Sequence, residues 1–204
     1  MNSKKVFLLI NGEPPKIFPN LSSYDIICAT DGAYDILKAH NIVPDFISGD
    51  FDSIKELPKT IEVICTPNQN FTDFDKILQI LSDRGFVDID VFGASSQEQD
   101  HFLGNIHTAF QWKNKLNITF FDNYGVYFLA DKKVVLPDCN GKKVSLFPFP
   151  KATGIITKGL KYPLNNESLS LGNRVGTRNQ ACDDIVEISY DTGDLFVFVN
   201  HIIE

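Results

Sequence analysis

The sequence contains few of the features that mark several common classes of protein. Only four of its 204 residues are cysteine, and they are scattered, with no Cys-x-x-Cys pair. We therefore expect neither a disulfide framework nor a structural zinc site. No apolar run is long enough to cross a membrane, and the apolar start, residues 6–10, is too short for a secretory signal. Together these absences predict a reducing, cytoplasmic setting.

Positive charge is also scarce. The chain carries 19 Lys and Arg against 26 Asp and Glu, a net charge of −7, and only three residues are arginine. This balance gives no basic footprint for nucleic acid, and a protein of this charge that handles phosphates needs metal ions or locally placed cations. The apolar content of 43% is that of a folded globular protein, and the length allows one large or two small domains.

Short apolar runs alternate with helical patterns over the first 122 residues. Helices are expected over about 33–40, 72–81 and 100–112, and strands at residues 6–10, 25–29, 46–47, 61–65, 89–92 and 118–121. This alternation is typical of a parallel sheet with helices on both faces. The expected N-terminal domain, residues 1–122, is therefore a Rossmann-like α/β/α domain.

After Asp122 the helical patterns stop. Short strands separated by Gly, Pro and Asn turns follow, among them residues 144–149 and 155–157. Such a series predicts a small all-β domain, residues 123–204, with the architecture of a sandwich.

Acidic residues follow four successive predicted strands. Asp31 follows the second strand, Asp50 and Asp52 the third, Asp73 the fourth and Asp100 the fifth. Parallel sheets bind ligands beyond the carboxyl ends of their strands, so these acids are expected at one edge. Each one alone could be a helix-capping or turn residue. Together they indicate a site for Mg²⁺ that carries substrate phosphates.

Two of the predicted helix starts carry further polar side chains. Thr72 is expected to cap a helix in whose first turn Asp73 and Lys76 are neighbours. An acid beside a lysine at a helix N-terminus suits phosphate groups, although a surface ion pair is the simpler alternative. At the start of the next helix, Asp100 is followed by His101, either a general base or, the alternative we favour, a buried structural histidine.

Seven stretches that span nearly the whole chain form a combination far more specific than any one of them. They are Thr30-Asp31-Gly32-Ala33, Pro44-Asp45 through Gly49-Asp50-Phe51-Asp52-Ser53, Thr72-Asp73-x-x-Lys76, Asp100-His101-x-x-x-Asn105, Ser145-Leu146-Phe147-Pro148, Thr157-x-Gly159-Leu160-Lys161-Tyr162-x-Leu164 and Gly176-Thr177-Arg178-Asn179. In this combination and order, the sequence resembles the thiamine pyrophosphokinase (thiamine diphosphokinase) family.

The resemblance implies a homodimeric enzyme that transfers the terminal pyrophosphoryl group of ATP to the hydroxyl of thiamine, giving thiamine diphosphate and AMP. By analogy, Mg²⁺ would be held by Asp50, Asp52 and Asp73. Lys76 would neutralise phosphate charge, and Asp100 would face the thiamine hydroxyl at the interface between subunits. The other binding residues that the resemblance implies are Asp31, Gly32, Thr72, Asn105, Thr177, Arg178 and Asn179.

The sequence departs from the family pattern in two places. The usual Gly-Gly-Arg is Ser96-Gln97-Glu98, and the usual Ser-Thr-Ser-Asn is Gly176-Thr177-Arg178-Asn179. One hypothesis is that Arg178, with Arg174, replaces the missing arginine across the dimer; a surface arginine on a β-turn is the alternative. The departures also leave two other functions open: a non-catalytic thiamine- or nucleotide-binding module, and an enzyme of the same fold with another donor or alcohol.

Overall fold

The computed structural model describes residues 4–52 and 58–201. It divides into two compact units, Met1–Asn123 and Tyr124–Glu204. Ser53, the last residue of the motif that begins at Pro44, lies outside the described residues. In the part of the chain that is described, no helix is both long and apolar enough to cross a membrane.

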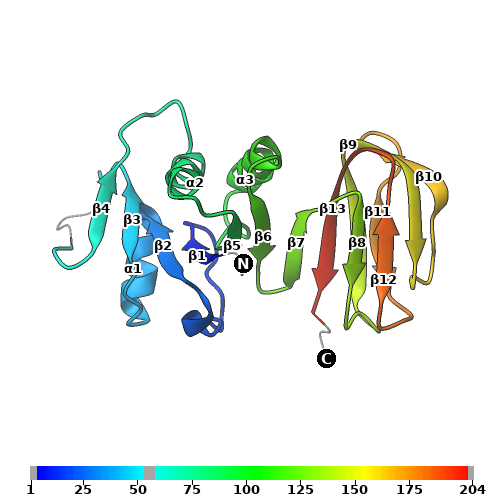
Figure 1. The fold of residues 1–204 in the computed structure, drawn as a ribbon, viewed down its shortest axis with the longest axis horizontal. Coiled ribbons are helices and arrows are strands. Elements are labelled where there is room, and N and C mark those ends of the chain that lie inside the picture. Colours follow the sequence, from blue (N-terminus) through cyan, green and yellow to red (C-terminus); the bar gives the residue numbers. More distant parts are fainter. Residues whose placement is uncertain (1–3, 53–57, 202–204) are drawn as a thin grey trace. The chain divides into compact units, whose positions relative to one another are not determined.

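The first unit is built on a parallel sheet (Figure 1). From one edge to the other its strands are β4 (Glu62–Cys65), β3 (Phe46–Gly49), β2 (Ile26–Thr30), β1 (Lys5–Leu9), β5 (Asp88–Phe92) and β6 (Asn117–Phe121). All neighbouring pairs are parallel. The strand order reverses between β1 and β5, and such sheets bind ligands outside the carboxyl ends of the strands at this point.

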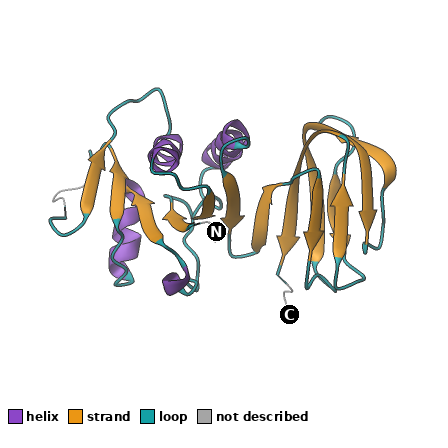
Figure 2. Ribbon diagram, viewed as in Figure 1, coloured by secondary structure: helices purple, strands orange, loops and turns teal. Residues whose placement is uncertain are grey.

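Helices cover both faces of this sheet, as the sequence predicts (Figures 1 and 2). Helix α1 (Asp31–Ala39) lies on one face; α2 (Asp73–Asp83) and α3 (Gln99–Trp112) lie on the other. A short 3₁₀ helix, η1 (Leu21–Ser23), precedes β2. The predicted helices and strands of this unit are present, with ends within two residues of the prediction.

Alternate residues of the strands supply the two apolar layers. Phe7 and Leu9 of β1 pack with Leu37 of α1 in one buried cluster, and on the opposite face Phe74 of α2 lies 6.0 Å from Phe120, ring centre to ring centre. Each fully buried side chain of this size contributes about 1.5–3 kcal/mol to folding. At the end of the helix predicted over residues 33–40, His40 is the C-cap of α1 and is exposed, and its ring centre lies 4.7 Å from that of Phe18.

The second unit consists of antiparallel strands. In sheet order they are β7 (Gly125–Leu129), β13 (Thr192–Asn200), β9 (Lys143–Lys158), β12 (Val186–Ser189) and β8 (Lys133–Leu136). Two further strands, β10 (Asn165–Ser170) and β11 (Gly176–Gln180), also pair with β9.

Strand β9 differs from the prediction. The two strands expected at residues 144–149 and 155–157 are parts of one strand of 16 residues. The strand continues because its partners change along its length: β13 pairs with residues 144–153, β11 with residues 143–146, β10 with residues 151–156 and β12 with residues 156–158. The strand therefore has a pairing partner along most of its length, with register shifts opposite β10, β11 and β13.

Candidate active site

A pocket of about 390 Å³ opens in the first unit, beyond the carboxyl ends of β1 and β5. This is the place that the reversal of strand order predicts. Its wall is formed by the chain segments that follow β1, β2, β4 and β5 and by the N-terminal parts of α2 and α3. Of the predicted site residues, those that line it are Asp31, Thr72, Asp73, Lys76, Asp100 and Asn105.

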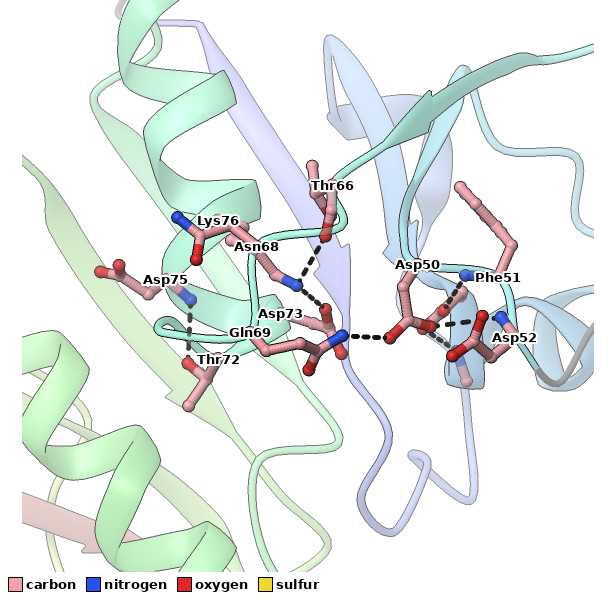
Figure 3. A network of polar contacts seen from close by, with 12 residues as sticks. Asp50, Phe51, Asp52, Thr66, Asn68, Gln69, Thr72, Asp73, Asp75 and Lys76 are labelled. Carbon is pink, nitrogen blue, oxygen red and sulfur yellow. Dashed lines mark hydrogen bonds and ion pairs between the residues drawn. The ribbon is translucent and has the colours of Figure 1, made fainter.

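Lys76 places a positive charge in the wall of the pocket, and Figure 3 shows its polar contacts. Its side chain is only 9% exposed, and its Nζ lies 2.7 Å from Asp73 Oδ1. The same Nζ donates a hydrogen bond of 2.9 Å to the carbonyl oxygen of Thr66. The N-terminus of α2 adds the partial positive charge of its free N–H groups, so this wall is suited to bind phosphate.

The first turn of α2 is fixed by two hydrogen bonds. The hydroxyl of Thr72 accepts from the backbone N–H of Asp75 at 3.2 Å, which confirms the predicted N-cap. The carboxylate of Asp75 accepts from Nε1 of Trp112, in α3, at 2.6 Å. Because α2 and α3 both line the pocket, this bond ties two of its walls together.

Gln69 is a pocket residue that the sequence analysis missed. Its Nε2 donates to Asp50 Oδ2 at 2.8 Å, and the backbone N–H of Asp52 donates to Asp50 Oδ1 at 3.2 Å (Figure 3). The bond from Gln69, followed by the backbone bond, lowers the pKa of Asp50 below its usual range. Asp50 is therefore a stable carboxylate beside the pocket, with Gln69 as the link between them.

Asp31 and Gly32 begin helix α1. Asp31 lines the pocket, but both of its carboxylate oxygens accept hydrogen bonds from backbone N–H groups. Oδ1 accepts from Gly32 at 2.7 Å, and Oδ2 accepts from Phe51 at 3.0 Å. Both oxygens of the Asp31 carboxylate are thus bonded to backbone N–H groups of the protein.

The three carboxylates expected to hold metal are partly separated by these contacts. Within residues 4–52 and 58–201, no three His, Cys, Asp or Glu side chains are close enough together to hold a metal ion. Asp73 pairs with Lys76, Asp50 bonds to Gln69, and Asp52 is exposed. Their oxygens are nevertheless the hard ligands that Mg²⁺ prefers, and Asp50 remains ionised.

The first turn of α3 protrudes beside the pocket. Asp100 Oδ1 accepts from the backbone N–H of His101 at 3.0 Å. His101 is 74% exposed, and its Nε2 lies 3.5 Å from a carboxylate oxygen of Glu98. The buried structural role that we favoured for His101 is therefore wrong, because the first turn of α3 extends into solvent. Further along, Asn105 Nδ2 donates to the carbonyl oxygen of Ala94 at 3.0 Å and so fixes the helix to the loop after β5.

The remaining predicted residues belong to β11 of the second unit. Thr177 and Arg178 are exposed. Asn179 uses its side-chain amide on the backbone of Tyr162: its Oδ1 accepts from the N–H at 3.1 Å, and its Nδ2 donates to the carbonyl at 2.7 Å. Arg174 pairs with Glu167 in the same unit.

Both parts of the chain match models of one protein family. Residues 19–120 match the thiamin pyrophosphokinase catalytic domain, and residues 132–195 match the thiamin pyrophosphokinase vitamin B1 binding domain. A thiamine pyrophosphokinase of Bacillus subtilis (strain 168) is 28% identical over 209 residues, which cover 95% of this chain and 97% of that protein. Thiamin pyrophosphokinase 1 of Caenorhabditis elegans is 28% identical over 222 residues, which cover 94% of this chain and 87% of that protein.

Solved structures share the fold. The crystal structure of thiamine pyrophosphokinase from Bacillus subtilis superimposes with a TM-score of 0.83 at 24% identity, over 97% of this chain and 100% of that one. A thiamin pyrophosphokinase family protein from Enterococcus faecalis superimposes with a TM-score of 0.86 at 20% identity, over 98% of this chain and 100% of that one. With both family domains matched in order along one chain, this protein belongs to the thiamin pyrophosphokinase family.

Proposed function

We propose that this protein is a thiamine pyrophosphokinase, which transfers the pyrophosphoryl group of ATP to the hydroxyl of thiamine and releases AMP. One observation carries the proposal: Asp73, Lys76 and Asp100 line a single pocket at the carboxyl edge of a parallel sheet. In this account the first unit is a Rossmann-like domain that binds ATP, and the second is a β-sandwich that binds thiamine. The matches to a catalytic and a vitamin B1 binding model support this division.

The phosphate end of the reaction depends on charge. Transfer to an alcohol requires in-line placement and neutralisation of negative charge more than covalent chemistry. Lys76 and the N-terminus of α2 provide positive charge for the phosphates of ATP. Asp50, Asp52 and Asp73 would hold Mg²⁺, which would neutralise further charge on the transferred group.

The alcohol end depends on Asp100. Its carboxylate lines the pocket at the start of α3, where it can orient the hydroxyl of thiamine or accept its proton. The acidic surroundings also suit the positive thiazolium ring of thiamine.

We further infer a homodimer in which thiamine lies between the first unit of one subunit and the second unit of the other. Thr177 and Arg178, which are exposed, are the proposed contacts from the second unit. Asn179 has both amide atoms engaged by Tyr162, so we assign it a supporting role in the shape of this surface. All four cysteines are free, which is compatible with the reducing environment of the cytoplasm.

The test is product formation with purified protein, thiamine, ATP and Mg²⁺. We expect thiamine diphosphate only when metal is present, and at least a 100-fold lower rate for Asp73→Asn, because loss of a group that stabilises charge has effects of about that size. Asp83→Asn, at the other end of the same helix, is the matched control and should retain the activity. Thiamine binding without product would instead support a binding module or another donor, and no thiamine binding at all would contradict the proposal.

A further inference from the structure

The backbone between Asp50 and Asp52 has an unusual conformation. Phe51 has a φ of 60°, in the left-handed region. A bulky residue rarely adopts this conformation, because its Cβ comes too close to the following carbonyl oxygen. Some contact must therefore hold Phe51 in place.

That contact comes from Asp31. The backbone N–H of Phe51 donates to Asp31 Oδ2 at 3.0 Å, and Asp31 Oδ1 accepts from the N–H of Gly32 at 2.7 Å. Asp31 is the first residue of α1, a helix whose Ala33 and Leu37 are buried in the core. The carboxylate thus connects the turn after β3 to a firmly packed helix.

Gly49 leaves the space that this contact needs. A Cβ at Gly49 would lie 2.2 Å from Cγ of Asp31, so no other residue fits without displacing the carboxylate. The register of the sheet brings the two residues together, since Thr30 and Ser48, which directly precede them, are paired between β2 and β3.

We infer that Asp31 is a positioning residue: it holds Phe51 in the left-handed conformation and thereby directs Asp50 and Asp52. The inference rests on the proposed function, in which these two carboxylates hold the metal. Both oxygens of Asp31 are engaged by the backbone, so its role is to shape the turn rather than to contact substrate. Without this contact, Phe51 would relax to an ordinary conformation and the two carboxylates would separate.

The inference predicts a specific rescue. Glycine adopts the left-handed conformation about as readily as the right-handed one. In a chain with Phe51→Gly, the turn should therefore depend much less on Asp31. The loss of the Phe51 ring is common to Phe51→Gly and the double variant, so it cancels when these two are compared.

The experiment measures Mn²⁺ binding to the free protein, from the electron paramagnetic resonance signal of the unbound ion, together with kcat and KM. Asp31→Ala should weaken Mn²⁺ binding and lower kcat by about tenfold, roughly the population penalty of a left-handed non-glycine residue. In the Phe51→Gly background, Asp31→Ala should change the affinity for Mn²⁺ and kcat by about threefold or less. The matched control is Asp35→Ala, an exposed acid one turn further along α1.

Equal losses in both backgrounds would overturn the inference, because they would mean that Asp31 acts directly on metal or substrate. Failure of the wild-type protein to bind Mn²⁺ would overturn it as well. Circular dichroism and a melting curve identify variants that fail to fold. If Asp31→Ala is among them, Asp31→Asn, which keeps one acceptor oxygen, replaces it in the cycle. Because Mn²⁺ binding is measured without substrates, a protein that binds the ion and shows the rescue, yet forms no thiamine diphosphate, would separate this inference from the proposed function.

Discussion

Replacement of Lys76 by methionine tests the charge arrangement of the pocket most simply. The change keeps the length of the side chain and removes its charge, leaving Asp73 Oδ1 and the carbonyl of Thr66 without their donor. At 2.7 Å the attraction between the two charges is about 6 kcal/mol for an effective dielectric constant of about 20. Desolvation offsets much of this attraction, and Asp73 is 41% exposed, so we expect a net loss of about 2 kcal/mol in the free energy of unfolding.

For a chain of this length, such a loss lowers the melting temperature by about 4–8 °C. We also expect kcat to fall by about 100- to 1,000-fold, since removal of one group that stabilises the transferred charge has effects of this size. Calorimetry and steady-state kinetics measure the two quantities, with Lys16→Met, at an exposed position, as the control. A melting temperature within 1 °C of the wild type, with activity reduced less than about threefold, would refute the reasoning.

Three further predictions concern stability and pH. Trp112→Phe removes the hydrogen-bond donor to Asp75 and should lower the free energy of unfolding by about 1.5–3 kcal/mol. Chemical denaturation measures this change, and an unchanged midpoint of the denaturation curve would contradict a stabilising role for the bond. Thr72→Ala removes the N-cap of α2 and should lower the free energy of unfolding by about 1 kcal/mol. Thr72→Ser keeps a hydroxyl at this position and should retain most of the stabilisation that the cap provides. Hydrogen bonds from Arg84 lower the pKa of Glu62, so this pair stabilises the fold above the usual pKa of a glutamate and ceases to do so as the pH falls through the lowered value. Arg84→Ala should therefore destabilise the protein at pH 7, and the difference from the wild type should shrink as the pH falls below the usual glutamate pKa of about 4.3 and through the lowered value; a difference that does not depend on pH would exclude this mechanism.

Periodicity and strand order accounted for most of the first unit. Alternating runs predicted its sheet and helices, and the rule that ligands bind at the carboxyl ends of parallel strands placed Asp31, Asp73 and Asp100 at one edge. All three line the pocket. These features could be predicted because they follow from local patterns and from one general property of parallel sheets.

Features that depend on contacts between distant segments could not be predicted. Gln69 lies in a loop without periodicity, and its partner Asp50 is 19 residues away. Strand β11 consists of the polar residues 176–180 and forms by pairing with β9 rather than by burial of an apolar face. The left-handed conformation of Phe51 is imposed by Asp31 against the preference of the residue itself, so no local pattern reveals it.

The identity of the nucleotide product tests the central claim most directly. Protein incubated with thiamine, ATP and Mg²⁺ should form AMP and thiamine diphosphate in equal amounts, as quantified by chromatography of the reaction mixture. Equal amounts would establish transfer of a pyrophosphoryl group. Formation of ADP with thiamine monophosphate, or hydrolysis of ATP with thiamine unchanged, would contradict the account.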